Sequence, residues 1–104
     1  MIVTSSSSIA GKRIVRTLGL VRGNTVRARH IGKDIVAAFK NIIGGEIEEY
    51  TKLMAESRDQ SVDRMIANAE ALGANAIVDA RFATSYIMAN AAEILVFGTA
   101  VIIE

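Results

Sequence analysis

The sequence predicts an α+β domain in which two strands, two helices and two further strands follow one another (ββααββ), with a mainly antiparallel sheet. Three observations support this fold class. The first third alternates apolar and polar residues, the middle third repeats apolar residues every three or four positions, and the last third returns to β-branched runs. A chain of 104 residues has room for one domain, which we place at residues 1–104.

The first two strands are predicted at Met1–Val3 and Lys12–Arg29, separated by a polar run that contains four consecutive serines. In the longer strand, one parity is apolar and the other carries Arg13 and Thr17. The apolar parity consists of Ile14, Leu18 and Leu20. Gly19 and Gly23 predict a bulge or a bend within this strand.

Two helices are predicted next. The first begins at about Gly32 and ends at Gly44-Gly45, because glycine readily adopts the positive φ that closes a helix. Its apolar face consists of Ile35, Val36, Phe39, Ile42 and Ile43. The second helix is predicted from about Glu46 to Leu72, with acidic residues in its first turn and Gly73 just past its end.

The last third predicts two strands, Ala76–Ile87 and Glu93–Ile103, joined around Met88–Ala92. The segment Phe82–Ile103 is long enough to span a membrane, but Glu93 lies near its middle and β-branched residues follow. We therefore predict two buried strands and no membrane association.

The last strand is apolar on both of its faces. A layer of two helices covers only one face of a sheet, so the other face must meet a loop, a ligand or another subunit. Since about half of this small chain is hydrophobic (51%), we expect another copy of the chain and hence a homo-oligomer.

The charges are divided unevenly along the chain. Residues 1–40 contain eight basic residues and one acidic residue, whereas residues 41–104 contain four basic and ten acidic residues. Aromatic side chains, on which bases of nucleic acids stack, do not interleave with the early basic residues, so nucleic acid is not an expected partner. The basic residues follow one face of the early strand in this prediction, and the acidic ones the outer face of the long helix. We expect these two surfaces to pair between neighbouring subunits.

The composition restricts metal and redox chemistry. The chain has no cysteine and one histidine, His30, so thiolate metal sites and disulfides are excluded, and a reducing, cytoplasmic location is expected. His30 is a weak candidate ligand, which a ring would repeat around its axis. Three carboxylates share one face of the long helix: Glu56, Asp59 and Asp63. We interpret them as a solvated helix surface, with a divalent-metal site as the alternative.

Arg58 lies in the middle of a heptad-spaced stripe on the long helix. The stripe consists of Ile47, Thr51, Met54, Arg58, Ser61, Met65, Asn68 and Leu72. A charge on such a stripe requires a partner. Within one chain, Arg58 either forms an ion pair or packs its aliphatic stem on the core while its guanidinium reaches solvent. Alternatively, it binds an anionic ligand or a carboxylate of another subunit at an interface. The sequence has no nucleophile elbow and no glycine-rich phosphate loop, so no catalytic apparatus is visible.

Several segments, in order and spacing, resemble the YbjQ-like family, the UPF0145 proteins. They are Ile9-Ala10-Gly11, Leu18-Gly19, Gly44-Gly45, Tyr50 with Arg58, Leu72-Gly73-Ala74-Asn75-Ala76-Ile77 and Gly98-Thr99-Ala100-Val101. The resemblance covers the whole chain. It departs from the family pattern where Glu46 replaces an Arg and Asp79 replaces a Gly, and His30 and Lys33-Asp34 also differ.

The resemblance implies an α+β fold that assembles into pentameric rings, with a family label of "putative heavy-metal binding" and no established activity. It makes Arg58, Tyr50, Asp34 and Asn75 candidates for ligand binding or for a subunit interface. We therefore expect a structural or small-ligand-binding homo-oligomer. Two alternatives stay open: a metal-binding protein whose ligands repeat around the ring axis, and an enzyme with an interface site built on Arg58 and Tyr50.

Overall fold

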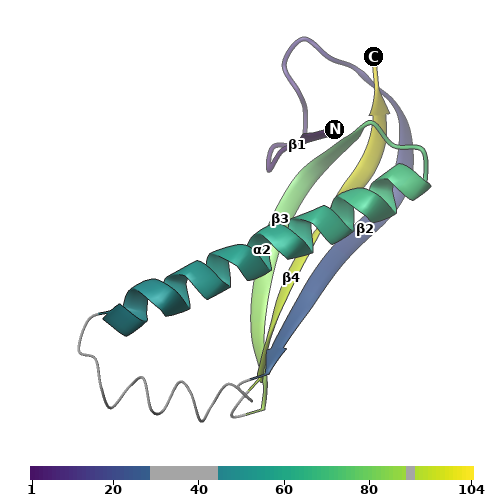
Figure 1. Ribbon diagram of the computed structural model, residues 1–104. Coiled ribbons are helices and arrows are strands. Elements are labelled where there is room, and N and C mark those ends of the chain that lie inside the picture. Colours follow the sequence, from purple (N-terminus) through teal and green to yellow (C-terminus); the bar gives the residue numbers. More distant parts are fainter. Residues whose placement is uncertain (29–44, 89–90) are drawn as a thin grey trace.

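One long helix lies diagonally across one face of a four-stranded sheet in the computed structural model (Figure 1). The structure describes residues 1–28, 45–88 and 91–104. Its elements in chain order are β1 (Ile2–Val3), β2 (Ile14–Ala28), α2 (Gly45–Ala71), β3 (Ala76–Met88) and β4 (Ala91–Ile103).

The sheet has the strand order β1-β3-β4-β2 and is mixed. β4 pairs antiparallel with both β2 and β3, whereas β1 pairs parallel with the start of β3 at Ala76 and Ile77. The predicted ββααββ order with a mainly antiparallel sheet is therefore wrong in two respects. The described elements follow the order ββαββ with one helix instead of two, and the segment predicted as the first helix lies outside the described residues. The N-terminal strand joins β3 in parallel, because the loop after Val3 carries the chain across to the opposite edge before β2 begins.

The individual strands and the long helix agree with the sequence pattern. α2 begins and ends within one residue of the predicted Glu46–Leu72, and Gly73 follows it with a positive φ of 88°. This left-handed conformation ends the helix, as the glycine predicted. The apolar segment Phe82–Ile103 forms most of β3 and β4, as expected. No helix among the described residues is long and apolar enough to cross a membrane.

The predicted faces of β2 are wrong because the strand bulges twice. Its register with β4 shifts between Ile14 and Arg16 and again between Thr17 and Gly19, so the second bulge occurs at one of the two predicted glycines. After this bulge the parity is reversed: Leu18 packs against the core under α2, whereas Leu20 points to the other side and is 71% exposed. Arg16 and Arg22 consequently lie on opposite faces, and the basic residues do not follow one face of the strand.

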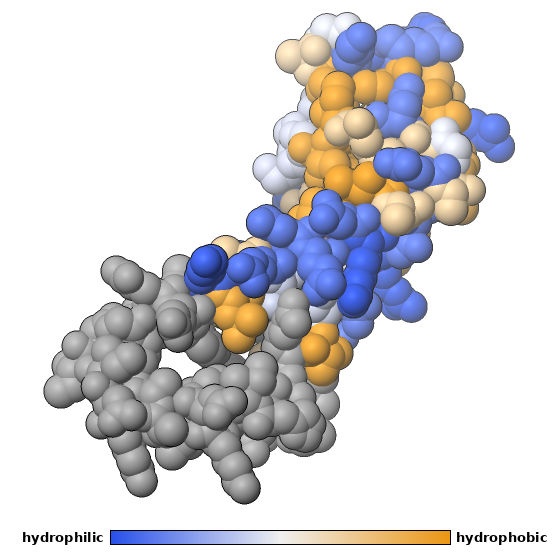
Figure 2. All heavy atoms as spheres, viewed as in Figure 1, coloured by the Kyte–Doolittle hydropathy of each residue, from blue (hydrophilic) through white to orange (hydrophobic). Residues whose placement is uncertain are grey.

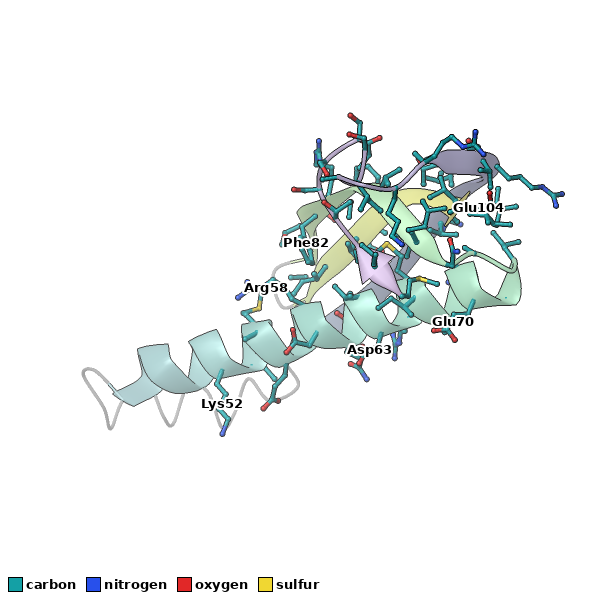
Figure 3. The ribbon with its side chains drawn as sticks, turned by 90° about the horizontal axis from the view of Figure 1, so that it is seen from above. Lys52, Arg58, Asp63, Glu70, Phe82 and Glu104 are labelled. Carbon is teal, nitrogen blue, oxygen red and sulfur yellow. The ribbon has the colours of Figure 1, made fainter. Side chains whose placement is uncertain are left out.

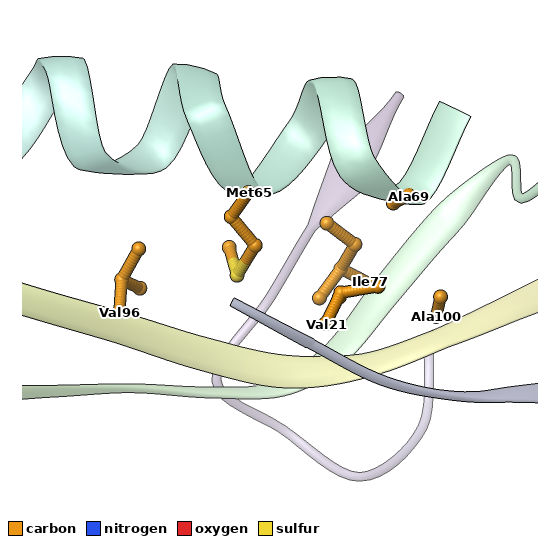
Figure 4. Packing of buried hydrophobic residues seen from close by; sticks show 6 residues of the cluster. All are labelled: Val21, Met65, Ala69, Ile77, Val96 and Ala100. Atoms are coloured by element: carbon orange, nitrogen blue, oxygen red, sulfur yellow. The ribbon is translucent and has the colours of Figure 1, made fainter. Parts of the chain in front are cut away.

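The core lies between α2 and the sheet (Figure 4). α2 packs mainly on β2 and β4 and only slightly on β3. The central cluster consists of Val21, Met65, Ala69, Ile77, Val96 and Ala100, each at most 4% exposed. A second, smaller cluster lies on the opposite side of the sheet at one end, where Ile9 of the N-terminal loop covers Val78 and Val101.

We call the rest of that opposite side the open face, since α2 does not cover it and the N-terminal loop reaches it only at Arg81. Its side chains come from three strands and are assigned by the alternation along each strand and by the register between strands. They are Leu20, Arg22, Asn24 and Val26 of β2, Leu95, Phe97 and Thr99 of β4, and Arg81, Ala83 and Ser85 of β3. Leu20 and Val26 are 71% and 53% exposed, so large apolar side chains on this face contact solvent in the isolated chain.

Asp79 has a positive φ of 55°, which is unusual for a residue other than glycine, and it lies at a register shift between Val78 and Arg81. A side chain in this region costs about 1 kcal/mol, although aspartate tolerates it better than most residues. We expect the variant Asp79→Gly to be more stable than Asp79→Ala by about 1 kcal/mol, since only glycine adopts this φ freely. Urea unfolding of the two variants measures the difference, and equal midpoints would show that this backbone is not strained.

Candidate functional site

Arg58 lies on α2 but is exposed, so it is not buried within its own chain. Among the described residues its guanidinium forms no hydrogen bond or ion pair. The buried stripe of α2 is instead Ser57, Ser61, Met65 and Ala69, one turn apart from one another. The heptad prediction therefore placed Ser61 and Met65 correctly, whereas Arg58 lies at the side of the stripe.

The side of α2 that carries Arg58 faces β3. One turn further along the helix, Val62 packs against the core together with Ala80 of β3. Beyond Ala80, Phe82 opposes Val96 in the sheet and so shares the side of the sheet on which α2 lies, yet it is 53% exposed because α2 hardly reaches β3. Figure 3 shows Arg58 on the sheet side of α2, toward Phe82. A free cation and an aromatic surface offer the chemistry that binds an anion carrying an apolar group.

Asn75 has a structural role in the described chain. Its side-chain Nδ2 donates a hydrogen bond to the carbonyl oxygen of Ile103 (2.9 Å), and its Oδ1 accepts one from the Ile103 backbone N–H (2.7 Å). The amide thereby pairs with the last residue of β4 as a neighbouring strand would. Each end of this side chain forms one hydrogen bond to Ile103, so the amide holds the end of β4 next to the start of β3.

The other predicted site residues are not brought together in the described part of the chain. Tyr50 lies in α2, but its side chain is outside the described residues, as are His30 and Asp34. The residues of the chain that the structure describes include no group of three His, Cys, Asp or Glu that could hold a metal ion. Glu56, Asp59 and Asp63 are exposed on the outer surface of α2, where Figure 2 shows hydrophilic residues over the middle of the helix.

Buried hydroxyl groups of β2 and α2 hold the helix on the sheet, and the hydropathy pattern of the sequence does not reveal such polar contacts. Thr25 of β2 is 2% exposed and its hydroxyl oxygen lies 3.0 Å from that of Ser61, which is completely buried. The carbonyl oxygens of Ser57 (2.9 Å) and Ile94 (3.2 Å) lie within acceptor distance of the Ser61 hydroxyl. These bonds satisfy buried polar groups and so specify how the helix sits on β2 and β4.

Two further side chains of α2 cover the outer edge of β2. Arg64 Nη1 donates to the carbonyl oxygen of Asn24 (2.6 Å), and Asn68 Nδ2 donates to that of Arg22 (2.7 Å). Carbonyl groups on an edge strand otherwise form a template for another strand. In the sequence, only the position of Asn68 on the heptad stripe pointed to this contact between α2 and the edge of β2. α2 covers this part of the edge, and the most exposed apolar side chains of β2 are those of the open face, Leu20 and Val26.

The centre of the open face carries a row of three side chains across three strands. Arg22 of β2 and Arg81 of β3 both oppose Phe97 of β4, so the phenyl ring lies between two exposed arginines. Arg81 Nη1 donates to the carbonyl oxygens of Ser5 (2.6 Å) and Ala80 (2.9 Å), which ties it to the N-terminal loop. The Arg22 guanidinium forms no ion pair or hydrogen bond with described residues.

The chain resembles known sequences and a solved structure over all or nearly all of its length. A family model described as "Putative heavy-metal-binding" matches residues 1–104. A UPF0145 protein of Dehalococcoides mccartyi is 54% identical over 104 residues and covers 100% of both chains, and one of Halorubrum lacusprofundi is 56% identical over 101 residues and covers 97% of each. A crystal structure of a protein of unknown function of the DUF74 family, from Pediococcus pentosaceus, shares the fold with a TM-score of 0.67 at 15% identity, over 100% of this chain and 98% of that one. The chain belongs to the YbjQ-like family of UPF0145 proteins.

Proposed function

We propose that the protein functions as a homo-oligomer whose subunits contact one another through the open face of the sheet, forming a closed ring. The observation that carries this proposal is the open face itself: a four-stranded sheet with one described helix has one side covered and leaves Leu20, Val26 and Phe97 on the other. Burying apolar surface contributes roughly 25 cal/mol per Å², which favours covering such a face with a second subunit.

The two edges of the sheet are less suited to assembly over part of their length. Arg64 and Asn68 cover part of the β2 edge, and the N-terminal segment pairs with the first part of β3 through β1, Thr4 and Ser6. An edge that is already hydrogen-bonded does not add a further strand. The proposal therefore assigns assembly to a face of the sheet, and the family resemblance adds the expectation of five subunits.

A variant at Leu20 tests this role of the open face. Leu20 is 71% exposed, so Leu20→Glu should leave the protomer folded while placing a charge in the subunit contact. We expect the protein concentration at which half of the chains are assembled to rise at least tenfold, measured by light scattering during gel filtration. The matched control is Val15→Glu, at a residue of the same strand that is 42% exposed and lies outside the open face. Assembly that Leu20→Glu leaves unchanged would contradict the proposal.

Heavy-metal binding is the second candidate, and it rests on the description of the family model. The described residues of one chain supply no cluster of ligands. A site would use residues outside them, among them His30 and Asp34, or ligands that repeat around the axis of a ring. Elemental analysis of protein purified without an affinity tag tests this candidate. A stoichiometric metal that is lost in His30→Ala would establish it, and metal-free, fully assembled protein that takes up none of the added divalent ions would refute it.

A further inference from the structure

The outer surface of α2 has a pattern that matches the centre of the open face. Asp63, Ala67 and Glu70 are exposed and lie three and four residues apart, on the side of the helix turned away from the sheet. Figure 3 shows Asp63 and Glu70 projecting from this side, opposite to Arg58. Neither carboxylate forms an ion pair or a hydrogen bond with described residues. The helix therefore presents two acidic groups with a small apolar residue between them.

The open face presents the complementary order, a basic group on each side of an aromatic ring. Arg22, Phe97 and Arg81 lie on adjacent strands in one row of the sheet. Strands lie about 4.8 Å apart, so the two arginine backbones are about 10 Å apart. Residues seven apart on a helix are separated by about 10.5 Å, which is the spacing of Asp63 and Glu70. A helix laid across the strands thus brings both acidic residues to the two arginines and places Ala67 over Phe97.

We infer that the open face of one subunit is covered by α2 of the next copy, with Asp63 and Glu70 of that helix at Arg22 and Arg81. This inference rests on the proposed assembly and specifies its partner surface. Stacking two open faces on each other would instead bring arginines of both subunits together, and like charges at an interface oppose association. Each subunit uses two different surfaces, so the contact is heterologous, and such contacts close into a ring when the rotation per subunit permits.

Charge reversal tests the pairing directly. Arg22, Asp63 and Glu70 make no side-chain contacts that the fold needs, so single variants should fold normally by circular dichroism. We expect Arg22→Glu, Asp63→Arg and Glu70→Arg each to raise the concentration for half-assembly at least tenfold, in line with the loss of a desolvated charge pair. We then combine Arg22→Glu with Asp63→Arg in one double variant and with Glu70→Arg in another. Only the double variant whose helix residue faces Arg22 should assemble again. Which of the two assembles gives the direction in which α2 lies across the strands.

The matched control is Arg16→Glu. It makes the same change of charge at an exposed residue of the same strand, but on the side of the sheet opposite to Arg22, and should leave assembly unchanged. A steric variant, Ala67→Trp, should dissociate the subunits without any change of charge. Loss of assembly in the single variants with no restoration in either combination would overturn the pairing while leaving the use of the open face intact. Single variants that assemble like the wild type would overturn it as well, whereas a monomeric wild type would refute the proposed function itself.

Discussion

Replacing Gly23 by alanine should lower the free energy of unfolding by about 3 kcal/mol or more. This is the largest loss of stability that we expect from adding one methyl group anywhere in the described chain. A Cβ atom at Gly23 would point into the backbone of α2, at the carbonyl oxygen of Ser61 and the amide nitrogen of Met65. Backbone atoms of a helix cannot rotate away, so α2 would have to move off β2. That movement would separate the Thr25 and Ser61 hydroxyls and open the core around Met65.

Urea unfolding at a fixed protomer concentration measures this effect, since the stability of an oligomer depends on concentration. The control is Arg16→Ala, at an exposed residue of the same strand, which should change the free energy of unfolding by less than about 0.5 kcal/mol. A Gly23→Ala variant as stable as the wild type would mean that the backbone of α2 does not contact β2 at this residue.

Replacing Asn75 by alanine should cost about 2 kcal/mol of stability. The variant loses both hydrogen bonds to Ile103, and the Ile103 backbone, which belongs to a residue only 8% exposed, is left with an unpaired N–H and C=O. Each such bond contributes about 1 kcal/mol, and an unsatisfied buried group costs at least as much.

Asn68→Ala is the matched control for Asn75. It also removes an amide that bonds a backbone carbonyl, but it breaks one exposed bond instead of two partly buried ones. We expect its cost to be below about 1 kcal/mol. Equal unfolding midpoints for the two variants would contradict the structural role of Asn75.

Much of the fold could be predicted from the sequence because apolar spacing and glycines are strong local signals. They placed α2, β3 and β4 within about two residues, and Gly73 at the end of the helix. The faces of β2 could not be predicted, since one inserted residue at a bulge exchanges the two sides of a strand, as Leu18 and Leu20 show. The pairing of β1 with β3 depends on a contact between distant segments, which no local pattern reports.

The candidate site was less predictable because its informative residues are polar or small. Hydropathy spacing drew attention to Arg58, whereas the helix meets β2 through Ser57, Ser61 and Ala69, which carry little hydropathy signal. Small residues one turn apart on α2, together with Gly23 on the strand, could have revealed this close approach. Asn75 was found through the family resemblance alone, and its role became clear only from the position of Ile103.

The most direct test of the central claim is a native mass spectrum of the wild-type protein recorded next to that of Leu20→Glu at the same micromolar concentration. We predict one closed oligomer of defined subunit number for the wild type, with five subunits expected from the family resemblance, and a larger fraction of folded monomer for the variant. A wild-type protein that is monomeric, or a variant with the same subunit number as the wild type, would contradict assembly through the open face.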